Sequence, residues 1–202
     1  MAKNALTVRD QASNAILDLV LHVPASTEQA LQHPAARAHA IGRIAARQAT
    51  LLASSLALPP GVLGWLTVLP ELIGVWRIQA QMVSDIAAVY GKQKALKREE
   101  MLYCLFKHVS AQLFRDVAVR VGQRVVVREA TTKVLQSIAQ ALGIKVTQKV
   151  LSKGAARFVP LLGAVGVGAY AYFDTLQVAR TANELFAQNS IDKVPPEPVE
   201  QA

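Results

Sequence analysis

The sequence predicts an all-α protein, a single multi-helix bundle with glycine-rich apolar helices. Apolar residues recur at spacings of three and four along almost the whole chain, which is the period of a helix with one buried face. Strand candidates are scarce, and proline or glycine marks most points where the helical pattern stops. With 202 residues, 52% of them hydrophobic and 18% charged, the chain is long enough for one domain with a sizeable core.

The N-terminal part is expected to form three helices. Residues 5–22 carry an apolar stripe that stops before Val23-Pro24. A second helix is expected to begin around residues 26–28. Pro34, a first-turn residue, then opens a long helix rich in alanine and arginine that runs to about Leu58.

The middle of the chain is divided by prolines. Pro59-Pro60-Gly61 is a hard break, and a short apolar piece, Val62–Leu69, follows it. Pro70 is expected in the first turn of the next helix, LPELIGVWRIQAQMVSDIAAVYG (69–91), and Gly91 is expected to cap its end.

The C-terminal half is also expected to be helical, and VGQRVVV (121–127) is the segment that could instead form a short strand. Residues 1–187 would make up the domain, and residues 188–202, which are acidic and rich in proline, a disordered tail. The predicted helices are 96–129, then 131–142 and 144–156 separated by Gly143, and a last helix from Pro160 to about Gln188.

Two stretches are almost free of charge. Glu71 is the only charged residue between Thr50 and Trp76, and residues 158–173 have none. A membrane span needs about 20 apolar residues, whereas prolines divide the first stretch and the second is too short before it reaches Asp174. Burial in a bundle, re-entrant insertion or shallow docking on a membrane fits these stretches better than a span.

The last predicted helix begins with a run of small residues that includes Pro160, Gly163, Gly166 and Gly168. Glycine inside a helix costs up to about 1 kcal/mol relative to alanine, so several of them require a packing reason. Two interpretations stay open: a tight helix crossing within a core, and an apolar element that inserts into a membrane.

Positive charge is concentrated in the middle third. Residues 92–157 contain fourteen Lys and Arg against four Asp and Glu, while the rest of the chain contains eight against ten. Residues four apart share a helix face, so two basic ridges are expected, with almost no acidic partners. They would bind an anion, with anionic lipid favoured over nucleic acid because stacking aromatics are scarce. The ridges are Arg120, Arg124 and Arg128, and Lys145, Lys149, Lys153 and Arg157.

The stretch 69–91 resembles the central signature of EcsC-family proteins, a poorly characterised and mostly bacterial family, in which an amphipathic helix after Leu-Pro ends in Ile-Ala-x-x-Tyr-Gly. Residues 149–186, with a basic lead, a proline and a glycine-rich run, are similar to that family's C-terminal part. The resemblance covers about half the chain and implies an α-helical protein, with links to transport and secretion in some members. It implies no catalytic residues. Phe173-Asp174 departs from the family's more usual turn rich in Asn or Thr.

Polar residues on the 69–91 helix suggest a lined cavity. Glu71, Gln81 and Asp85 share a face apart from the main apolar stripe, and buried carboxylates of this kind often mark a site. Cys104 and His108, one turn apart, could form a nucleophile and base, although their apolar neighbours favour a buried structural thiol. No catalytic motif, metal-ligand pattern or cofactor motif occurs, so no cofactor or metal is expected.

The sequence therefore predicts a non-enzymatic protein that binds anionic lipid or a membrane partner through basic ridges and a glycine-rich apolar helix. The N-terminus lacks the apolar core of a signal peptide, which predicts a cytoplasmic protein, peripheral to the inner membrane where it meets lipid. Two alternatives stay open: a soluble interaction module that docks an acidic protein, and a hydrolase of unrecognised type. The oligomeric state is not predicted.

Overall fold

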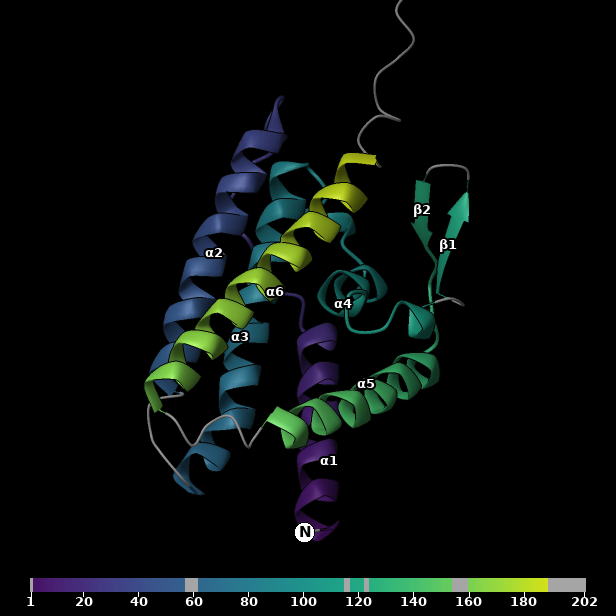
Figure 1. Ribbon diagram of the computed structural model, residues 1–202. Coiled ribbons are helices and arrows are strands. Elements are labelled where there is room, and N and C mark those ends of the chain that lie inside the picture. The colour runs from purple at the N-terminus through teal and green to yellow at the C-terminus, as the bar shows by residue number, and fades with distance from the viewer. Residues whose placement is uncertain (1, 57–61, 115–116, 122–123, 154–159, 189–202) are drawn as a thin grey trace, which may run out of the picture.

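The computed structural model describes residues 2–56, 62–114, 117–121, 124–153 and 160–188, and in them the chain forms a helical bundle with one small β-hairpin (Figure 1). The predicted all-α class is confirmed. Except for Gln188, the predicted tail 188–202 lies outside the described residues. The helices are α1 (Ala2–Leu21), α2 (Pro34–Leu56), α3 (Val62–Val89), α4 (Arg98–Phe106), α5 (Thr132–Lys153) and α6 (Pro160–Gln188).

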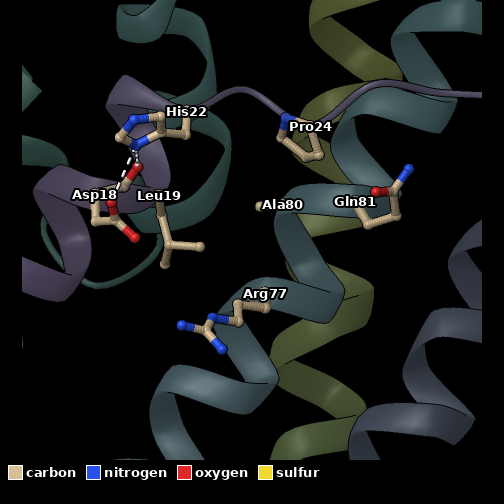
Figure 2. A pocket seen from close by; sticks show the side chains of 7 residues that line it. All are labelled: Asp18, Leu19, His22, Pro24, Arg77, Ala80 and Gln81. Atoms are coloured by element: carbon tan, nitrogen blue, oxygen red, sulfur yellow. Dashed lines mark hydrogen bonds and ion pairs between the residues drawn. The ribbon is translucent and has the colours of Figure 1, made fainter.

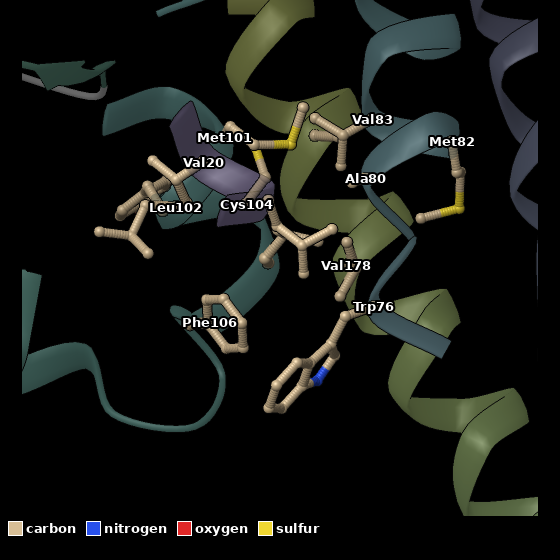
Figure 3. Packing of buried hydrophobic residues seen from close by; sticks show 14 of the residues in the cluster. Val20, Trp76, Ala80, Met82, Val83, Met101, Leu102, Cys104, Phe106 and Val178 are labelled. Atoms are coloured by element: carbon tan, nitrogen blue, oxygen red, sulfur yellow. The ribbon is translucent and has the colours of Figure 1, made fainter. Parts of the chain in front are cut away.

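Three long helices, α2, α3 and α6, pack along one another, and α1 packs against α5, which crosses it (Figure 1). The short helix α4 contacts α1, α3 and α6, so it joins the two groups. The main core lies around α4, where the rings of Trp76 and Phe106 meet edge to face at 5.4 Å between centroids (Figure 3). Cys104 is fully buried there among Met101, Leu102 and Val20.

The segment between α1 and α2 is not helical, so the helix predicted around residues 26–28 is wrong. The segment instead follows α3 as an extended strap. Ser84 donates its hydroxyl to Pro24 O at 2.6 Å, Gln81 Nε2 donates to Ala25 O at 2.9 Å, and Leu31 N donates to Val89 O at 2.9 Å. Because α3 satisfies these three backbone groups of the strap, they need no partners within a helical turn.

Helix α3 runs without a break through Pro70, so the prediction that Pro70 lies in the first turn of a helix is wrong. The separate piece Val62–Leu69 therefore belongs to the same helix. The predicted cap at its other end is confirmed, because Gly91 has a φ of 69°. Gly91 N donates to Ala88 O at 2.8 Å and Lys92 N donates to Ala87 O at 2.7 Å, the paired bonds of a Schellman motif.

Residues 96–129 do not form the predicted long helix. After α4, two short strands, β1 (Ala118–Val121) and β2 (Arg124–Val127), pair antiparallel with Val119 opposite Val126. The possible strand at 121–127 is thus found mainly as β2. Five of the eight strand residues are valine, and β-branched side chains favour the pleated conformation over a helix. Gln188 at the end of α6 accepts a hydrogen bond from Val125 N at 3.1 Å.

Gly143 does not separate two helices, as predicted, but lies inside α5. It is buried where α5 crosses α1: a Cβ atom would overlap the hydroxyl of Ser13 and lie 3.0 Å from Arg9 O. The glycine is therefore a packing residue that lets two backbones approach closely.

Helices α2 and α6 run antiparallel with small residues between them. A Cβ at Gly42 would lie 2.8 Å from Ala179 Cβ, and a Cβ at Gly168 would overlap the hydroxyl of Ser54 and lie 3.3 Å from Thr50 Cγ2. At Gly168, the interpretation as a tight helix crossing is confirmed. Gly166 differs, because a Cβ there would meet nothing within 4 Å.

Candidate functional site

A buried polar cluster centres on Asp174 of α6. Its carboxylate accepts a hydrogen bond from Gln79 Nε2 on α3 at 2.9 Å, and its other oxygen lies 2.9 Å from His108 Nε2, just after α4. Gln79 Nε2 also donates to Thr175 Oγ1 at 3.1 Å. The side chains of His108 and Asp174 are only 15% and 12% exposed. The cluster therefore ties together α3, α6 and the turn after α4.

Burial alone would raise the pKa of Asp174. Hydrogen bonds from His108, Gln79 and Tyr170, together with the charge of His108, outweigh burial and lower that pKa below its ordinary value of 3.8. The carboxylate is therefore ionised at neutral pH and presents its two oxygens to Gln79 Nε2 and His108 Nε2. Burial, and then the negative charge of Asp174 and the hydrogen bond to it, raise the pKa of Tyr170, which stays protonated.

Two atoms of the cluster are buried without a hydrogen-bond partner among the described residues: Gln79 Oε1 and His108 Nδ1. A carboxylate that orients a histidine, leaving its second ring nitrogen available, is the arrangement of a general base. Hydrolysis by a covalent route also needs a nucleophile next to that nitrogen. Among the described residues, none forms a hydrogen bond with His108 Nδ1, and Cys104 is fully buried, which raises the pKa of its thiol. The buried structural thiol that the sequence favours is confirmed for Cys104, and the cluster at Asp174 connects α3, α6 and the turn after α4.

The polar residues predicted to line one cavity do not share one. Glu71 and Asp85 stand fourteen residues apart on the continuous helix α3, which is roughly 21 Å at the rise of an α-helix, so they cannot act as a carboxylate pair. Glu71 is buried. Gln81 is exposed and donates to Asp85 Oδ1 at 2.9 Å.

Gln81 does line a pocket, as Figure 2 shows, but neither Glu71 nor Asp85 is among its lining residues. The pocket, of about 270 Å³, is open and lies between the end of α1 and α3. Arg77 reaches into it from α3, and on the other side His22 Nδ1 pairs with Asp18 at 3.0 Å. The pocket has a mixed charge and wide access to solvent, so it offers no enclosed site. Its lining residues are Asp18, Leu19, His22, Pro24, Arg77, Ala80 and Gln81.

The first predicted basic ridge is wrong in its geometry. Arg120 lies in β1, Arg124 in β2 and Arg128 beyond β2, so the spacing of four does not bring them to one helix face. Arg128 is exposed. A hairpin in place of a helix removes the reason for treating these three residues as one surface.

The second predicted ridge keeps its helical spacing. Lys145, Lys149 and Lys153 all belong to α5, while Arg157 lies outside the described residues. Lys145 donates from Nζ to Ser110 Oγ at 2.7 Å. This bond joins α5 to the start of the short helix at Ala111–Phe114, so at least one lysine of the ridge also has a role within the fold.

The described parts of the two nearly charge-free stretches come together at one end of the three long helices. Residues 48–56 end α2, residues 62–70 begin α3 and residues 160–173 begin α6, and none of them is charged. Figure 1 shows these three helix ends at the lower left of the molecule. We call these residues the apolar end; it includes the predicted insertion residues Pro160, Gly163, Gly166 and Gly168.

Large apolar side chains of the apolar end face solvent. Leu51 of α2 and Val165 of α6 are each 71% exposed, and Phe173 is 64% exposed. Gly166 is exposed as well, whereas Gly168 is buried against α2. Single exposed apolar residues are normal, but several on adjacent helices mark a contact surface.

No family model, curated protein or solved structure matches the chain. The resemblance to EcsC proteins therefore stays a prediction from the quoted stretches. Among the described residues, none of the helices has the length and hydropathy of a membrane span.

The Asp174 cluster is not predicted by the sequence, in which Asp174 marks only the end of the second charge-free stretch. A lone carboxylate in an apolar helix is costly to bury without partners, and that signal could have pointed to a cluster. The partners themselves lie 66 and 95 residues away in sequence, with no spacing to connect them.

Proposed function

We propose that this protein docks peripherally on an anionic membrane with its apolar end in the outer part of one leaflet. The observation that carries the proposal is the meeting of three charge-free helix ends with Leu51, Val165 and Phe173 exposed to solvent. An apolar surface of this kind gains free energy when lipid replaces water around it.

The dimensions favour shallow docking. The charge-free part of α6, residues 160–173, rises roughly 21 Å, less than the ~30 Å of a bilayer's hydrocarbon core. Asp174, which follows, is ionised and held by partners from α3 and the turn after α4. Deeper insertion along α6 would carry this buried charge into the hydrocarbon, so the Asp174 cluster sets a limit on depth.

Excess positive charge supports the choice of an anionic membrane. The chain carries a net charge of +8, and each Lys or Arg near an anionic surface contributes about 1 kcal/mol. In Figure 1, helix α5, with Lys145, Lys149 and Lys153, runs towards the side of the molecule on which the apolar end lies. Apolar contact and charge together would give a reversible attachment.

Replacing Val165 and Phe173 with glutamate is expected to abolish co-flotation with vesicles of mixed neutral and anionic phospholipid. Each substitution places a charge where the proposal places lipid, at about 2–3 kcal/mol or more per residue in hydrocarbon. The wild-type protein is expected to float with anionic vesicles and less with neutral ones, and high salt is expected to weaken its binding.

Leu31→Glu is the matched control for the single substitution Val165→Glu, because Leu31 is also an exposed apolar residue, at 46%, but lies in the strap away from the apolar end. Its flotation should match that of the wild type. Equal loss in the control, or wild-type protein that stays at the bottom with every vesicle, would refute the proposal.

A further inference from the structure

A cluster of arginines adjoins the apolar end on the side where α2 and α6 meet. Arg43 and Arg47 lie on α2, Arg180 lies on α6, and all three are exposed. None of them forms an ion pair with a described residue. We call these three residues the arginine collar.

Packing of α2 against α6 places the collar on a single side. Gly42 and Ala179 form a close contact between these antiparallel helices, and Arg43 and Arg180 each follow directly. One residue further along a helix turns by about 100°. Because α2 and α6 are antiparallel, both rotations of about 100° lead to the same side of the interface between them. Arg43 and Arg180 therefore lie on one side of the Gly42–Ala179 contact. Arg47 lies one turn beyond Arg43 on the same side.

The order of residues along this face is polarised. Arg180 lies one residue beyond the Gly42–Ala179 contact, and from that contact towards the Gly168–Thr50 contact the face passes Arg43 and then Arg47. Beyond them come the exposed apolar residues Leu51 and Val165. Cations therefore border the apolar end on the side away from its tip, at the depth where a docked protein would meet lipid phosphates.

Acidic side chains are nearly absent from the face. Helix α2 contains no Asp or Glu, and α6 contains only Asp174 and Glu184. Asp174 is buried in its own cluster, and Glu184 lies 3.8 Å from Lys107 Nζ. A set of guanidinium groups without acidic partners is suited to external phosphate, which their planar donor geometry matches.

We propose that Arg43, Arg47 and Arg180 bind the phosphate groups of anionic lipids and hold the apolar end at the bilayer surface, an inference that rests on the proposed membrane docking. The collar replaces the first predicted ridge as the phosphate-binding surface and adds to the lysines of α5. Its occupant is a phospholipid bilayer, because the arginines are continuous with an exposed apolar surface that free phosphate would leave in water.

The test compares two triple substitutions with the same change in net charge. Arg43→Gln/Arg47→Gln/Arg180→Gln removes the collar, and Lys94→Gln/Arg98→Gln/Arg128→Gln removes three exposed cations elsewhere. At about a fivefold change in binding per cation at the surface, the collar variant should lose roughly a hundredfold in partitioning onto vesicles with anionic phospholipid. The control variant should lose much less. Circular dichroism and thermal unfolding establish that both variants fold.

Each outcome separates the two proposals. If both variants lose vesicle binding equally, or if the collar variant loses none while the wild type binds, the collar is overturned and the proposal of membrane docking stands. A wild-type protein that binds no vesicle would overturn both. A wild-type dimer that dissociates on Phe173→Glu would make this face an interface between copies and overturn the collar as a lipid site.

Discussion

Replacing Asp174 with alanine should lower the free energy of unfolding by about 2–5 kcal/mol, because buried partners lose their acceptor at a cost of about 1–3 kcal/mol each. In the wild-type protein, Gln79 Nε2 and His108 Nε2 each lie 2.9 Å from an Asp174 oxygen. The substitution removes both oxygens. Tyr170 also loses its hydrogen bond to the carboxylate. Chemical denaturation followed by circular dichroism measures the change.

Asp85→Ala is the matched control, because Asp85 accepts a hydrogen bond only near the surface, from Gln81, and should cost much less. The pH dependence gives a second check. The pKa of Asp174 is lower in the folded protein than its ordinary value of 3.8. Its ionised form therefore stabilises the fold above about pH 3.8, and this stabilisation is lost as the pH falls through the pKa of the folded state. Asp174→Ala should lack this component of acid destabilisation. A cost below about 1 kcal/mol would contradict the cluster's role in joining the helices.

Gly168→Leu should destabilise the protein by about 1–3 kcal/mol, the usual cost of overpacking a tight contact. A Cβ at this position already overlaps the Ser54 hydroxyl and approaches Thr50, so a leucine would push α2 away from α6. Thermal unfolding of the purified variant measures the effect.

Gly166→Leu, two residues earlier on the same helix, is the control. A Cβ there meets nothing within 4 Å, and leucine has a better helix propensity than glycine by somewhat under 1 kcal/mol. The variant should be at least as stable as the wild type. Equal destabilisation at both positions would show that the glycine-rich run is sensitive for a reason other than the α2–α6 contact.

Much of the fold could be predicted because apolar periodicity and proline positions are local signals. The starts of α2 at Pro34 and of α6 at Pro160, and the cap at Gly91, follow from the preferences of single residues. The errors at Gly143 and Pro70 share a cause. A glycine or proline inside a helix reads as a break unless the packing around it is known, and the packing of Gly143 depends on α1, far away in sequence.

The sequence favours a helix over the hairpin, because the valines of β1 and β2 also fit a helical stripe when they are read with the residues before them. That choice made a ridge of Arg120, Arg124 and Arg128 that the strands do not form. The sequence does not predict the collar, because its residues are far apart in the chain. Arg43, Arg47 and Arg180 lie outside the basic middle third, and Arg180 meets the other two only through the α2–α6 contact.

The central claim is that the apolar end enters a bilayer, and an environment-sensitive fluorophore at residue 165 tests it most directly. The label would be attached to Val165→Cys in a Cys104→Ala background, with Gln140→Cys on the exposed face of α5 as the reference site. On addition of anionic vesicles, the label at 165 should shift to the blue and become accessible to quenchers within the lipid, while the label at 140 should stay in water. An unchanged spectrum at 165, or equal shifts at both sites, would contradict docking through the apolar end.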